Sequence, residues 1–304
     1  MLFVSIGECM VEMAEAGDDR YRLGFAGDTL NTAWYARARL PADWQVEYYT
    51  ALGTDEYSGR MTSFLNENGI GTPYVRSVPE RRPGLYLIHQ ADGDRHFTYW
   101  RGQSAARLLA DDPEHLAAAV DSADVIYFSG ITMAILTPEA RARLLSVVES
   151  ARKSRGTKIA FDPNIRLPLW SSRQEARDAV MQAAPVADIV FPTWGDDADL
   201  FGDQSLEATA TRYLDAGCSH VVVKNGAGDA LAATNVRRVS KAPSQHVMSI
   251  DPTGAGDSFN GAYIAAILTG ATLGEALREA HEVAGQVISQ RGALIPQSDV
   301  HPTP

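Results

Sequence analysis

The chain alternates between short apolar runs and longer segments in which apolar residues recur with helical spacing. This order is typical of βαβ units, in which helices cover a mainly parallel sheet. The predicted strands are Leu2–Ile6, Gln45–Thr50, Asp124–Ser129, Lys158–Asp162, Asp188–Phe191 and His220–Lys224. The predicted helices are Leu30–Leu40, Tyr57–Asn68, Pro138–Ser154, Gln174–Ala184, Leu206–Ala216, Asp257–Thr269 and Leu273–Ser289. We therefore predict an α/β fold in which residues 1–304 form a single domain around one central sheet.

One stretch departs from this alternation, between Pro83 and Arg101. Its two arms are rich in β-branched and aromatic residues, and the dipeptide Asp92-Gly93 between them favours a tight hairpin turn. With the Gly-containing segment Asp19–Asp28, this hairpin predicts a small antiparallel sheet that projects from the main domain. We expect the sheet to act as a lid, formed by residues of about 14–28 and 83–101. The alternative is a solvent-side hairpin with no role in binding.

The composition and charge exclude several classes of protein. Hydrophobic residues make up 45% of the chain and charged residues 21%, which excludes disorder, collagen and coiled coil. Acidic residues outnumber basic ones 38 to 27, and the formal charge is −11. This sign argues against binding to nucleic acid through its phosphates. An anionic small molecule would need a local basic pocket.

The sequence also carries no sign of a membrane or an oxidising compartment. The first residues, MLFVSIGECMVEM, lack the basic stretch and the cleavage site of a signal peptide, and no stretch reaches about 18 apolar residues. The two cysteines, Cys9 and Cys218, have no CxxC spacing, which predicts reduced, buried thiols. We expect a cytoplasmic protein without a membrane partner.

Small, polar or charged residues follow the predicted strands. In open α/β sheets the ligand binds beyond the carboxyl ends of the strands, so these residues are expected to converge there. They are Gly7-Glu8, Ser129-Gly130, Pro163-Asn164 with Arg166, Pro192-Thr193, and Lys224-Asn225-Gly226.

The strongest local motif is DPTGAGD at Asp251–Asp257, directly before a predicted helix. Gly254 and Gly256, with Ala255 between them, let the backbone turn so that several amides point into one concavity at a helix N-terminus. Such an anion hole can hold the charge of a phosphoryl group during transfer. Asp257 lies beside it and could take a proton from an attacking hydroxyl, although an Asp at this place can also merely cap the helix.

Other catalytic motifs are missing from the sequence. There is no GK dipeptide of a Walker A loop, no GxGxxG, no GxSxG and no HExxH. The seven histidines have no metal-ligand spacing. The missing motifs therefore argue against hydride transfer with a Rossmann-bound dinucleotide, against acyl transfer and against zinc-dependent hydrolysis.

The motifs together resemble the ribokinase-like (pfkB) carbohydrate kinases. DPTGAGDSFNGAYI at Asp251–Ile264 is similar to the C-terminal signature of that family, and AGDTLN at Ala26–Asn31 resembles its GGxxxN element, with Ala26 in place of the first glycine. Further similar segments run across nearly the whole chain: GECMVE, TALGTDEYSG, DPNIRLPLW, VVVKNGAGD and RGALIP. The resemblance implies a ribokinase-like fold and phosphoryl transfer from ATP to a sugar, with Asp257 as the base.

Within the family, the segments GDTLNTA, PGLY and YWR resemble the branch that phosphorylates the terminal hydroxyl of 2-keto-3-deoxygluconate to give the 6-phosphate. An acidic sugar needs fixed cations, and arginine binds carboxylates in a bidentate manner. The resemblance assigns to the substrate Gly27, Asp28, Asn31, Tyr86, Tyr99, Arg101, Arg166 and Asp257. Each assignment has a structural alternative. Tyr86 and Tyr99 could simply pack within the hairpin, and each arginine could be a solvated surface charge.

The same resemblance implies sites for the nucleotide and its ions. It assigns to ATP the residues Asn164, Thr193, Lys224, Gly226, Gly228, Asp229, Gly254, Gly256 and His281. Lys224 has a structural alternative, a buried ion pair. Mg²⁺ is expected to bridge the phosphates of ATP rather than to occupy a protein cage. Many relatives also bind a monovalent cation such as K⁺ near the position of Asp251 and Arg291–Ala293, and the sequence leaves open whether this chain needs one.

Two other functions remain open. Fructokinases also resemble the DPNxRxxLW element, so a neutral-sugar kinase is one alternative, which would give Tyr99 and Arg101 no carboxylate to bind. Related acidic sugars such as 2-keto-3-deoxygalactonate or ketogluconate are alternative substrates within the hypothesis of a sugar-acid kinase. A sensor that binds a sugar acid without phosphorylating it is a further alternative, although Gly254, Gly256 and Asp257 are all intact. A lid sheet often pairs with its copy, so we expect a homodimer.

Overall fold

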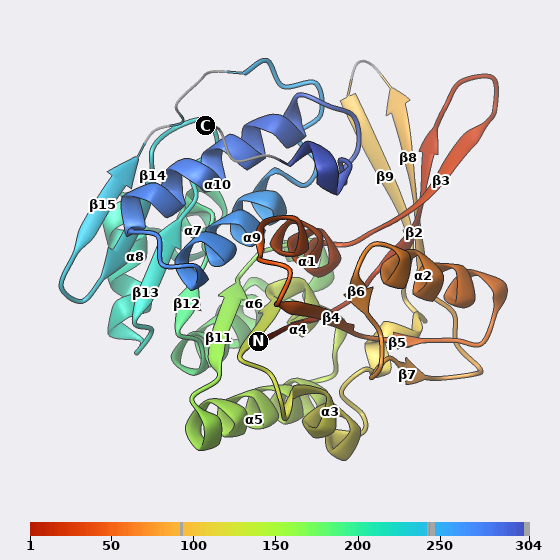
Figure 1. Cartoon of the computed structure of the whole chain (residues 1–304), viewed down its shortest axis with the longest axis horizontal. Helices are drawn as coiled ribbons and strands as arrows, with labels where there is room; N and C mark the ends of the chain where they lie inside the picture. Colours follow the sequence, from red (N-terminus) through yellow and green to blue (C-terminus); the bar gives the residue numbers. More distant parts are fainter. Residues whose placement is uncertain (92–93, 242, 244–246, 301–304) are drawn as a thin grey trace.

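The computed structural model describes residues 1–91, 94–241, 243 and 247–300, and within them it confirms the predicted central sheet (Figure 1). The strand order is β15-β14-β13-β12-β11-β10-β1-β4-β6. The strands are parallel from β6 to β13, and β14 and β15 each run antiparallel to the strand before them. The bounds are β1 (Leu2–Ile6), β4 (Gln45–Tyr49), β6 (Ile70–Gly71), β10 (Val125–Ser129), β11 (Lys158–Asp162), β12 (Ile189–Val190), β13 (His220–Val223), β14 (Ala230–Thr234) and β15 (Arg238–Lys241).

Helices cover both faces of this sheet, and each face has its own core. Side chains of β1 alternate between the two: Leu2, Val4 and Ile6 enter one core, and Phe3 enters the other. The first core is completed by α3 (Pro113–Val120), α4 (Gly130–Ile135), α5 (Pro138–Arg155), α6 (Arg173–Ala183), α7 (Trp194–Phe201) and α8 (Leu206–Asp215). The second is completed by α1 (Asp28–Arg39), α2 (Glu56–Glu67), α9 (Ala255–Leu268) and α10 (Leu273–Ile288). The sheet is therefore buried on both sides, as its continuous apolar strands predict.

The predicted lid is present as a second sheet, which projects from the main body (Figure 1). Its order is β3-β2-β8-β9, with β2 (Met10–Glu15), β3 (Tyr21–Ala26), β8 (Gly84–Ala91) and β9 (Asp94–Trp100). The pairs β2–β3 and β8–β9 are antiparallel hairpins, joined by a parallel pairing of β2 with β8. The predicted turn Asp92-Gly93 lies outside the described residues. The lid also begins earlier than expected, because Met10–Glu15 follows β1 directly and was not recognised as a strand.

The other differences concern short elements. The chain also forms β5 (Ala51–Leu52) paired with β7 (Arg76–Ser77), and the 3₁₀ turns Ala105–Leu108, Leu167–Leu169, Ala184–Val186 and Gln297–Asp299. Periodicity did not predict these elements. It also missed the strands β6, β14 and β15 of the central sheet, which have five residues or fewer, and the helices α3, α4 and α7, which have eight residues or fewer. Elements this short show too few repeats of a pattern. Cys9 and Cys218 are free and buried, as predicted. Among the residues that the structure describes, no helix has the length and apolar character needed to cross a bilayer.

Candidate active site

A cavity of about 640 Å³ lies where the strand ends of the main sheet meet the lid. Its wall brings together most of the predicted site residues, from segments far apart in the sequence. These are Gly27, Asp28, Asn31, Tyr86, Tyr99, Arg101, Asn164, Arg166, Thr193, Lys224, Gly226, Gly254, Ala255, Gly256 and Asp257. The sequence reasoning assigned no role to several other residues of the wall: Glu8, Met10, Phe97, Ile131, Asp162, Asp196, Pro252 and Thr253.

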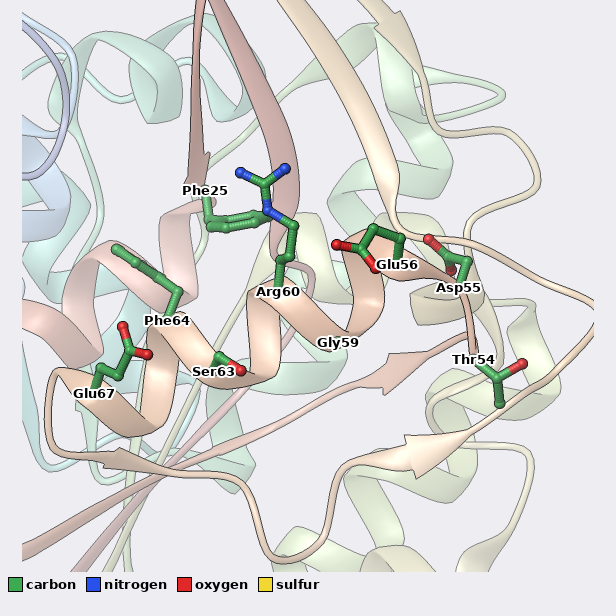
Figure 2. Close-up of a pocket in the computed structure, with 9 residues that line it drawn as sticks. All are labelled: Phe25, Thr54, Asp55, Glu56, Gly59, Arg60, Ser63, Phe64 and Glu67. Carbon is green, nitrogen blue, oxygen red and sulfur yellow. The ribbon is translucent and has the colours of Figure 1, made fainter.

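A second hollow, of about 700 Å³, lies elsewhere, along α2 beside Phe25 of the lid strand β3 (Figure 2). Phe64 and Arg60 of α2 lie opposite Phe25, and acidic side chains flank them. None of the predicted site residues lines this second hollow. Because they gather in the wall of the first cavity, the first cavity is the candidate site.

Three helices begin at the wall of that cavity, and all three lack a side-chain cap. Their N-cap residues are Gly27 for α1, Thr193 for α7 and Gly254 for α9. Each of the other described α-helices starts at a Ser, Thr or Asp whose side chain accepts a backbone amide of the first turn. Three helix N-termini, with their positive dipole ends, therefore meet the cavity without a side-chain cap.

The turn before α9 has the form that its glycines predict. Gly254 has φ of 80°, and a Cβ there would lie 2.8 Å from the carbonyl oxygen of Ala293, so glycine is required on two grounds. The amide of Ala255 is used internally, by the carbonyl of Pro252 at 3.2 Å. For the amides of Gly256 and Asp257, no acceptor is recorded among the described residues. The helix begins at Ala255, so Asp257 stands in its first turn and is not its cap, which removes the capping alternative.

Asp257 lies inside the cavity wall, held by Asn31 of α1. The Asn31 amide nitrogen donates to Asp257 Oδ2 at 2.8 Å. Burial raises the pKa of Asp257 to about 7, and the negative charges of Asp28 and Asp162 act in the same direction. Asn31 and Lys224 oppose this shift. A carboxylate with a pKa near neutrality suits proton transfer from a hydroxyl.

Lys224 forms the buried ion pair that was its structural alternative, and it also lines the cavity. Its Nζ donates to Asp162 Oδ2 at 2.5 Å, and Asn260 donates to the same oxygen at 2.6 Å. A Cβ placed on Gly256 would lie 3.5 Å from Lys224 Nζ, so the ammonium lies against the start of α9. The pair thus anchors a cation beside the free amides, where charge develops in phosphoryl transfer.

Asn164 connects the floor of the cavity with the loop that starts α1. Its side chain donates to Asp28 Oδ2 at 2.8 Å, and its amide donates to Asp162 Oδ1 at 2.8 Å. Its φ of 32° is unusual for a residue with a side chain, although asparagine tolerates it best. Burial raises the pKa of Asp28, while hydrogen bonds from Ser129 and Asn164 act against this. Asn164, predicted for the nucleotide, therefore contacts the loop predicted for the sugar.

The lid side chains that face the cavity are held by two buried carboxylates: Glu8, which the sequence placed at the ligand edge of the sheet, and Glu12, which it did not single out. The hydroxyl of Tyr86 donates to Glu12, and the guanidinium of Arg101 pairs with Glu8. Tyr99 completes the wall, with its ring centre 5.6 Å from that of Tyr86 and 5.9 Å from the guanidinium carbon of Arg101. Arg101 is therefore mostly buried and paired, and the alternative of a solvated surface charge is wrong for it. Because Glu8 offsets its charge, only part of that charge is available to a ligand.

Arg166 is the more accessible cation of the cavity. Its side chain is 53% exposed, and its Nη1 lies 3.4 Å from Asp196 Oδ2 and 3.0 Å from its neighbour's carbonyl oxygen. A long, partly solvated ion pair of this kind is weak. The guanidinium is therefore available to an anionic ligand at this edge of the cavity.

Some predicted nucleotide residues do not line the cavity. Gly228 and Asp229 lie beyond Gly226, and Asp229 accepts a hydrogen bond from Ser240 at 3.1 Å. His281 of α10 is buried: a ring nitrogen lies 2.9 Å from the carbonyl of Lys241, and its ring lies edge-on to Phe259.

Asp251 is fully buried and accepts hydrogen bonds from the backbone amides of Thr253 at 3.0 Å and Gly292 at 2.6 Å. Among the described residues, no cluster of three or more metal-ligating side chains occurs.

Comparison with known proteins gives the following matches. The family model for pfkB family carbohydrate kinases matches residues 2–299. The 2-dehydro-3-deoxygluconokinase of Escherichia coli K12 is 40% identical over 302 residues, which cover 96% of both chains. A fructokinase of Solanum tuberosum is 31% identical over 224 residues, covering 71% of this chain and 64% of that one. An E. coli structure in complex with ATP and Mg²⁺ is 23% identical, covers 96% of this chain and 94% of its own, and has a TM-score of 0.82.

Proposed function

Because the chain belongs to the pfkB family of carbohydrate kinases, we propose that it phosphorylates the terminal hydroxyl of 2-keto-3-deoxygluconate, also called 2-dehydro-3-deoxygluconate, with ATP. The observation that carries the proposal is a single cavity with three features. It holds Asp257 with a pKa near 7, the open amides at the start of α9, and the two arginines Arg101 and Arg166. The identity of 40% to a 2-dehydro-3-deoxygluconokinase over nearly the full length supports the choice of substrate.

In the proposed complex the sugar acid lies between the lid and Asp257. Arg166 and Arg101 bind its carboxylate, and the loop of Gly27, Asp28 and Asn31 binds its hydroxyls. The rings of Tyr86 and Tyr99 pack against its carbon chain. This orientation leaves the hydroxyl at the far end of the sugar within reach of Asp257.

The chemical step follows from the charges of the floor. Asp257 accepts the proton as the hydroxyl oxygen bonds to the γ-phosphorus of ATP, and the bond from that phosphorus to ADP breaks. The amides of Gly256 and Asp257 and the ammonium of Lys224 hold the negative charge of the transferred group. Closure of the lid excludes water, which would otherwise compete as the acceptor.

ATP is proposed to lie on the side of Thr193 and Gly226, with its phosphates against α9 and Lys224. When bound with ATP, Mg²⁺ would neutralise part of the phosphate charge. The carboxylates of Asp162 and Asp196 line the same wall, and such hard oxygen donors fit this ion. Gly228, Asp229 and His281 remain proposed nucleotide residues that would extend the site beyond the cavity.

We further propose that residues 1–304 form one domain with a movable lid, which works in the cytoplasm as a homodimer. Exposed aromatic residues on the edge strand β9, Phe97, Tyr99 and Trp100, support pairing through the lid. A monovalent cation such as K⁺ near Asp251 is a further proposal. Asp251 binds the amides of Thr253 and Gly292, which brings the anion-hole loop against residues 291–293.

A fructokinase is the alternative that the sequence left open, and the arginines argue against it. A neutral hexose would offer Arg166 no anionic ligand and would give the Glu8–Arg101 pair no role in the choice of substrate. The similarity to the potato fructokinase is also lower and covers less of the chain. A sensor without catalysis has less support, because Gly254, Gly256 and Asp257 are all in place at the cavity.

The test is an ADP-release assay over a panel of sugar acids and neutral hexoses, with Arg166→Ala and Arg101→Ala. We expect the highest kcat/KM for 2-keto-3-deoxygluconate. Arg166→Ala should raise its KM about 10- to 100-fold, because a hydrogen bond to a charged group contributes about 1.5–3 kcal/mol. Arg101→Ala should have a smaller effect, since Glu8 already offsets its charge. Arg155→Ala, an exposed arginine on α5, is the matched control.

A higher kcat/KM for fructose than for every sugar acid would reject the substrate assignment. No ADP release with any sugar, despite tight binding of a sugar acid, would favour the sensor instead.

A further inference from the structure

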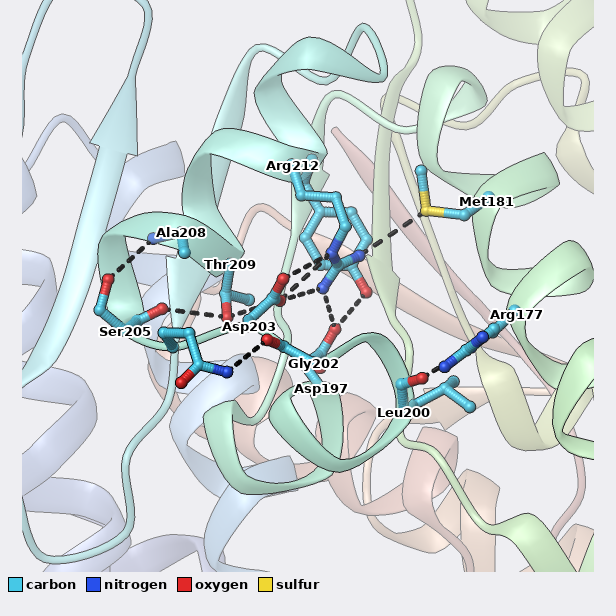
Figure 3. A network of polar contacts seen from close by, with 12 residues as sticks. Arg177, Met181, Asp197, Leu200, Gly202, Asp203, Ser205, Ala208, Thr209 and Arg212 are labelled. Carbon is cyan, nitrogen blue, oxygen red and sulfur yellow. Dashed lines mark hydrogen bonds and ion pairs between the residues drawn. The ribbon is translucent and has the colours of Figure 1, made fainter.

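A buried cluster of charges lies between α7 and α8, next to the cavity but outside it (Figure 3). Arg212 of α8 donates to Asp197 Oδ1 of α7 at 2.8 Å and to Asp203 Oδ2 at 2.6 Å. The hydroxyl of Tyr213 donates to the same oxygen of Asp197 at 2.7 Å. The guanidinium also packs on the ring of Phe201, 3.7 Å from its centre. One arginine therefore joins α7, the loop that follows it and α8.

Stabilisation of the fold does not explain why this charged cluster is buried. The Asp197 side chain is 0% exposed, and its Oδ2 is buried with no hydrogen-bond partner among the described residues. Burial raises the pKa of Asp197 to about 6, against the opposing effects of Tyr213 and Arg212. A raised pKa means that the fold disfavours the ionised form, so stability falls as pH rises from about 4 to 6. A neutral residue of the same shape would cost the fold less.

What the cluster holds in place is α7, and α7 forms part of the active-site wall. Its N-cap Thr193 and its residue Asp196 line the cavity, and Asp196 lies 3.4 Å from Arg166. The amide of Trp194 donates to the carbonyl of Lys224 at 2.9 Å. Asp196 and Asp197 are neighbours about 100° apart around the helix, so one faces the cavity while the other faces α8. A rotation of α7 would move both together.

We propose that Asp197 and Arg212 are positioning residues, which hold α7 in the rotation that keeps Asp196 beside Arg166 and so set the affinity of the cavity for the acidic sugar. The inference rests on the proposed function, because it assigns Arg166 to the substrate carboxylate. It adds two residues that touch neither substrate nor nucleotide.

The test compares Asp197→Asn with Asp199→Asn. Both change an aspartate of α7 to its amide, but Asp199 is 63% exposed and pairs with Arg173 at the surface. In Asp197→Asn we expect the KM for the sugar acid to rise about 3- to 10-fold, with kcat within twofold of wild type, because Asp196 no longer holds the half-exposed guanidinium of Arg166 toward the cavity. Its melting temperature at pH 7 should be unchanged or higher, because a buried charge is removed while Asp203 still holds Arg212. Asp199→Asn should behave as wild type.

The split between KM and kcat is the readout that a merely structural role would not change. A loss of stability alone would lower the amount of active enzyme, and with it the apparent kcat, and would leave the KM unchanged. A rise in KM at constant kcat therefore reports the position of α7.

A wild-type KM in Asp197→Asn, or a lower melting temperature with an unchanged KM, would overturn the inference. If that variant does not fold, Asp203→Asn decides, since it removes the other partner of Arg212. It should raise the KM about two- to threefold, and an unchanged KM would again reject the proposal. Failure of the wild type to phosphorylate any sugar acid would instead reject the proposed function.

Discussion

The floor and the lid of the cavity are built in different ways. On the floor, Asp162 is 2% exposed and receives hydrogen bonds from Lys224, Asn260 and Asn164, which come from three separate segments. On the lid, Tyr99 is 50% exposed, and its contacts in the wall are the rings of Tyr86 and Phe97 and the guanidinium of Arg101. The floor carboxylate is buried and held by several hydrogen bonds, whereas Tyr99 on the lid is half-exposed and held by ring contacts and one cation–π contact.

This difference matches two different demands. Phosphoryl transfer needs the base, the amides and the cation at set distances, because electrostatic stabilisation works only where it is already organised. Choosing a sugar acid needs a wall that can close on it and open again. We therefore expect changes in the floor to act on kcat and changes in the lid to act on KM.

The largest effect is expected from Asp257→Asn. The amide keeps the size of the side chain but cannot accept the proton, so kcat should fall about 10²- to 10⁴-fold with little change in KM for the sugar. The fold should remain, because Asn31 can still hydrogen-bond to the amide oxygen. Turnover by coupled ADP release and melting by circular dichroism measure the two quantities. Asp121→Asn, an exposed aspartate, is the matched control. Turnover near that of wild type would exclude Asp257 as the base.

The pH dependence of turnover gives the next largest effect. Burial raises the pKa of Asp257 to about 7, and the base must be ionised to act. Hence kcat should fall about tenfold for each pH unit below about 7. Stability should change in the opposite direction, because the fold disfavours the ionised carboxylate: it should decrease as pH rises from about 4 to 7. Asp257→Asn should lose this part of the stability profile. A kcat that stays constant from pH 8 to pH 5 would contradict the assignment.

The floor was more predictable from sequence than the lid, for a physical reason. Asp257, Gly254 and Lys224 follow strands or precede helices, and elements of this length have clear periodicity. Once the strands are known to be parallel, the residues after their carboxyl ends must lie along the same edge of the sheet. The loop at Asp251–Asp257, most of which lines the cavity, was predicted as a site from its local chemistry alone.

The partners of these residues were not predictable, because they depend on contacts between distant segments. Glu8 and Arg101 are 93 positions apart, and Lys224 and Asp162 are 62 positions apart. No local pattern indicates which carboxylate a cation will meet. The short helix α7 was missed for a related reason: it begins at Thr193 without a side-chain cap, since its N-terminus opens to the cavity.

The smallest effect is expected at Tyr99, and it tests the lid directly. Tyr99→Leu removes the ring that lies beside Tyr86 and Arg101, interactions that contribute about 0.5–1 kcal/mol each in such settings. The KM for the sugar acid should rise about two- to fivefold, with kcat unchanged, in steady-state assays with saturating ATP. Tyr99→Phe keeps the ring and should keep the KM. If Tyr99→Leu instead lowered kcat at constant KM, the lid would take part in the chemical step, and the division of roles between lid and floor would be wrong.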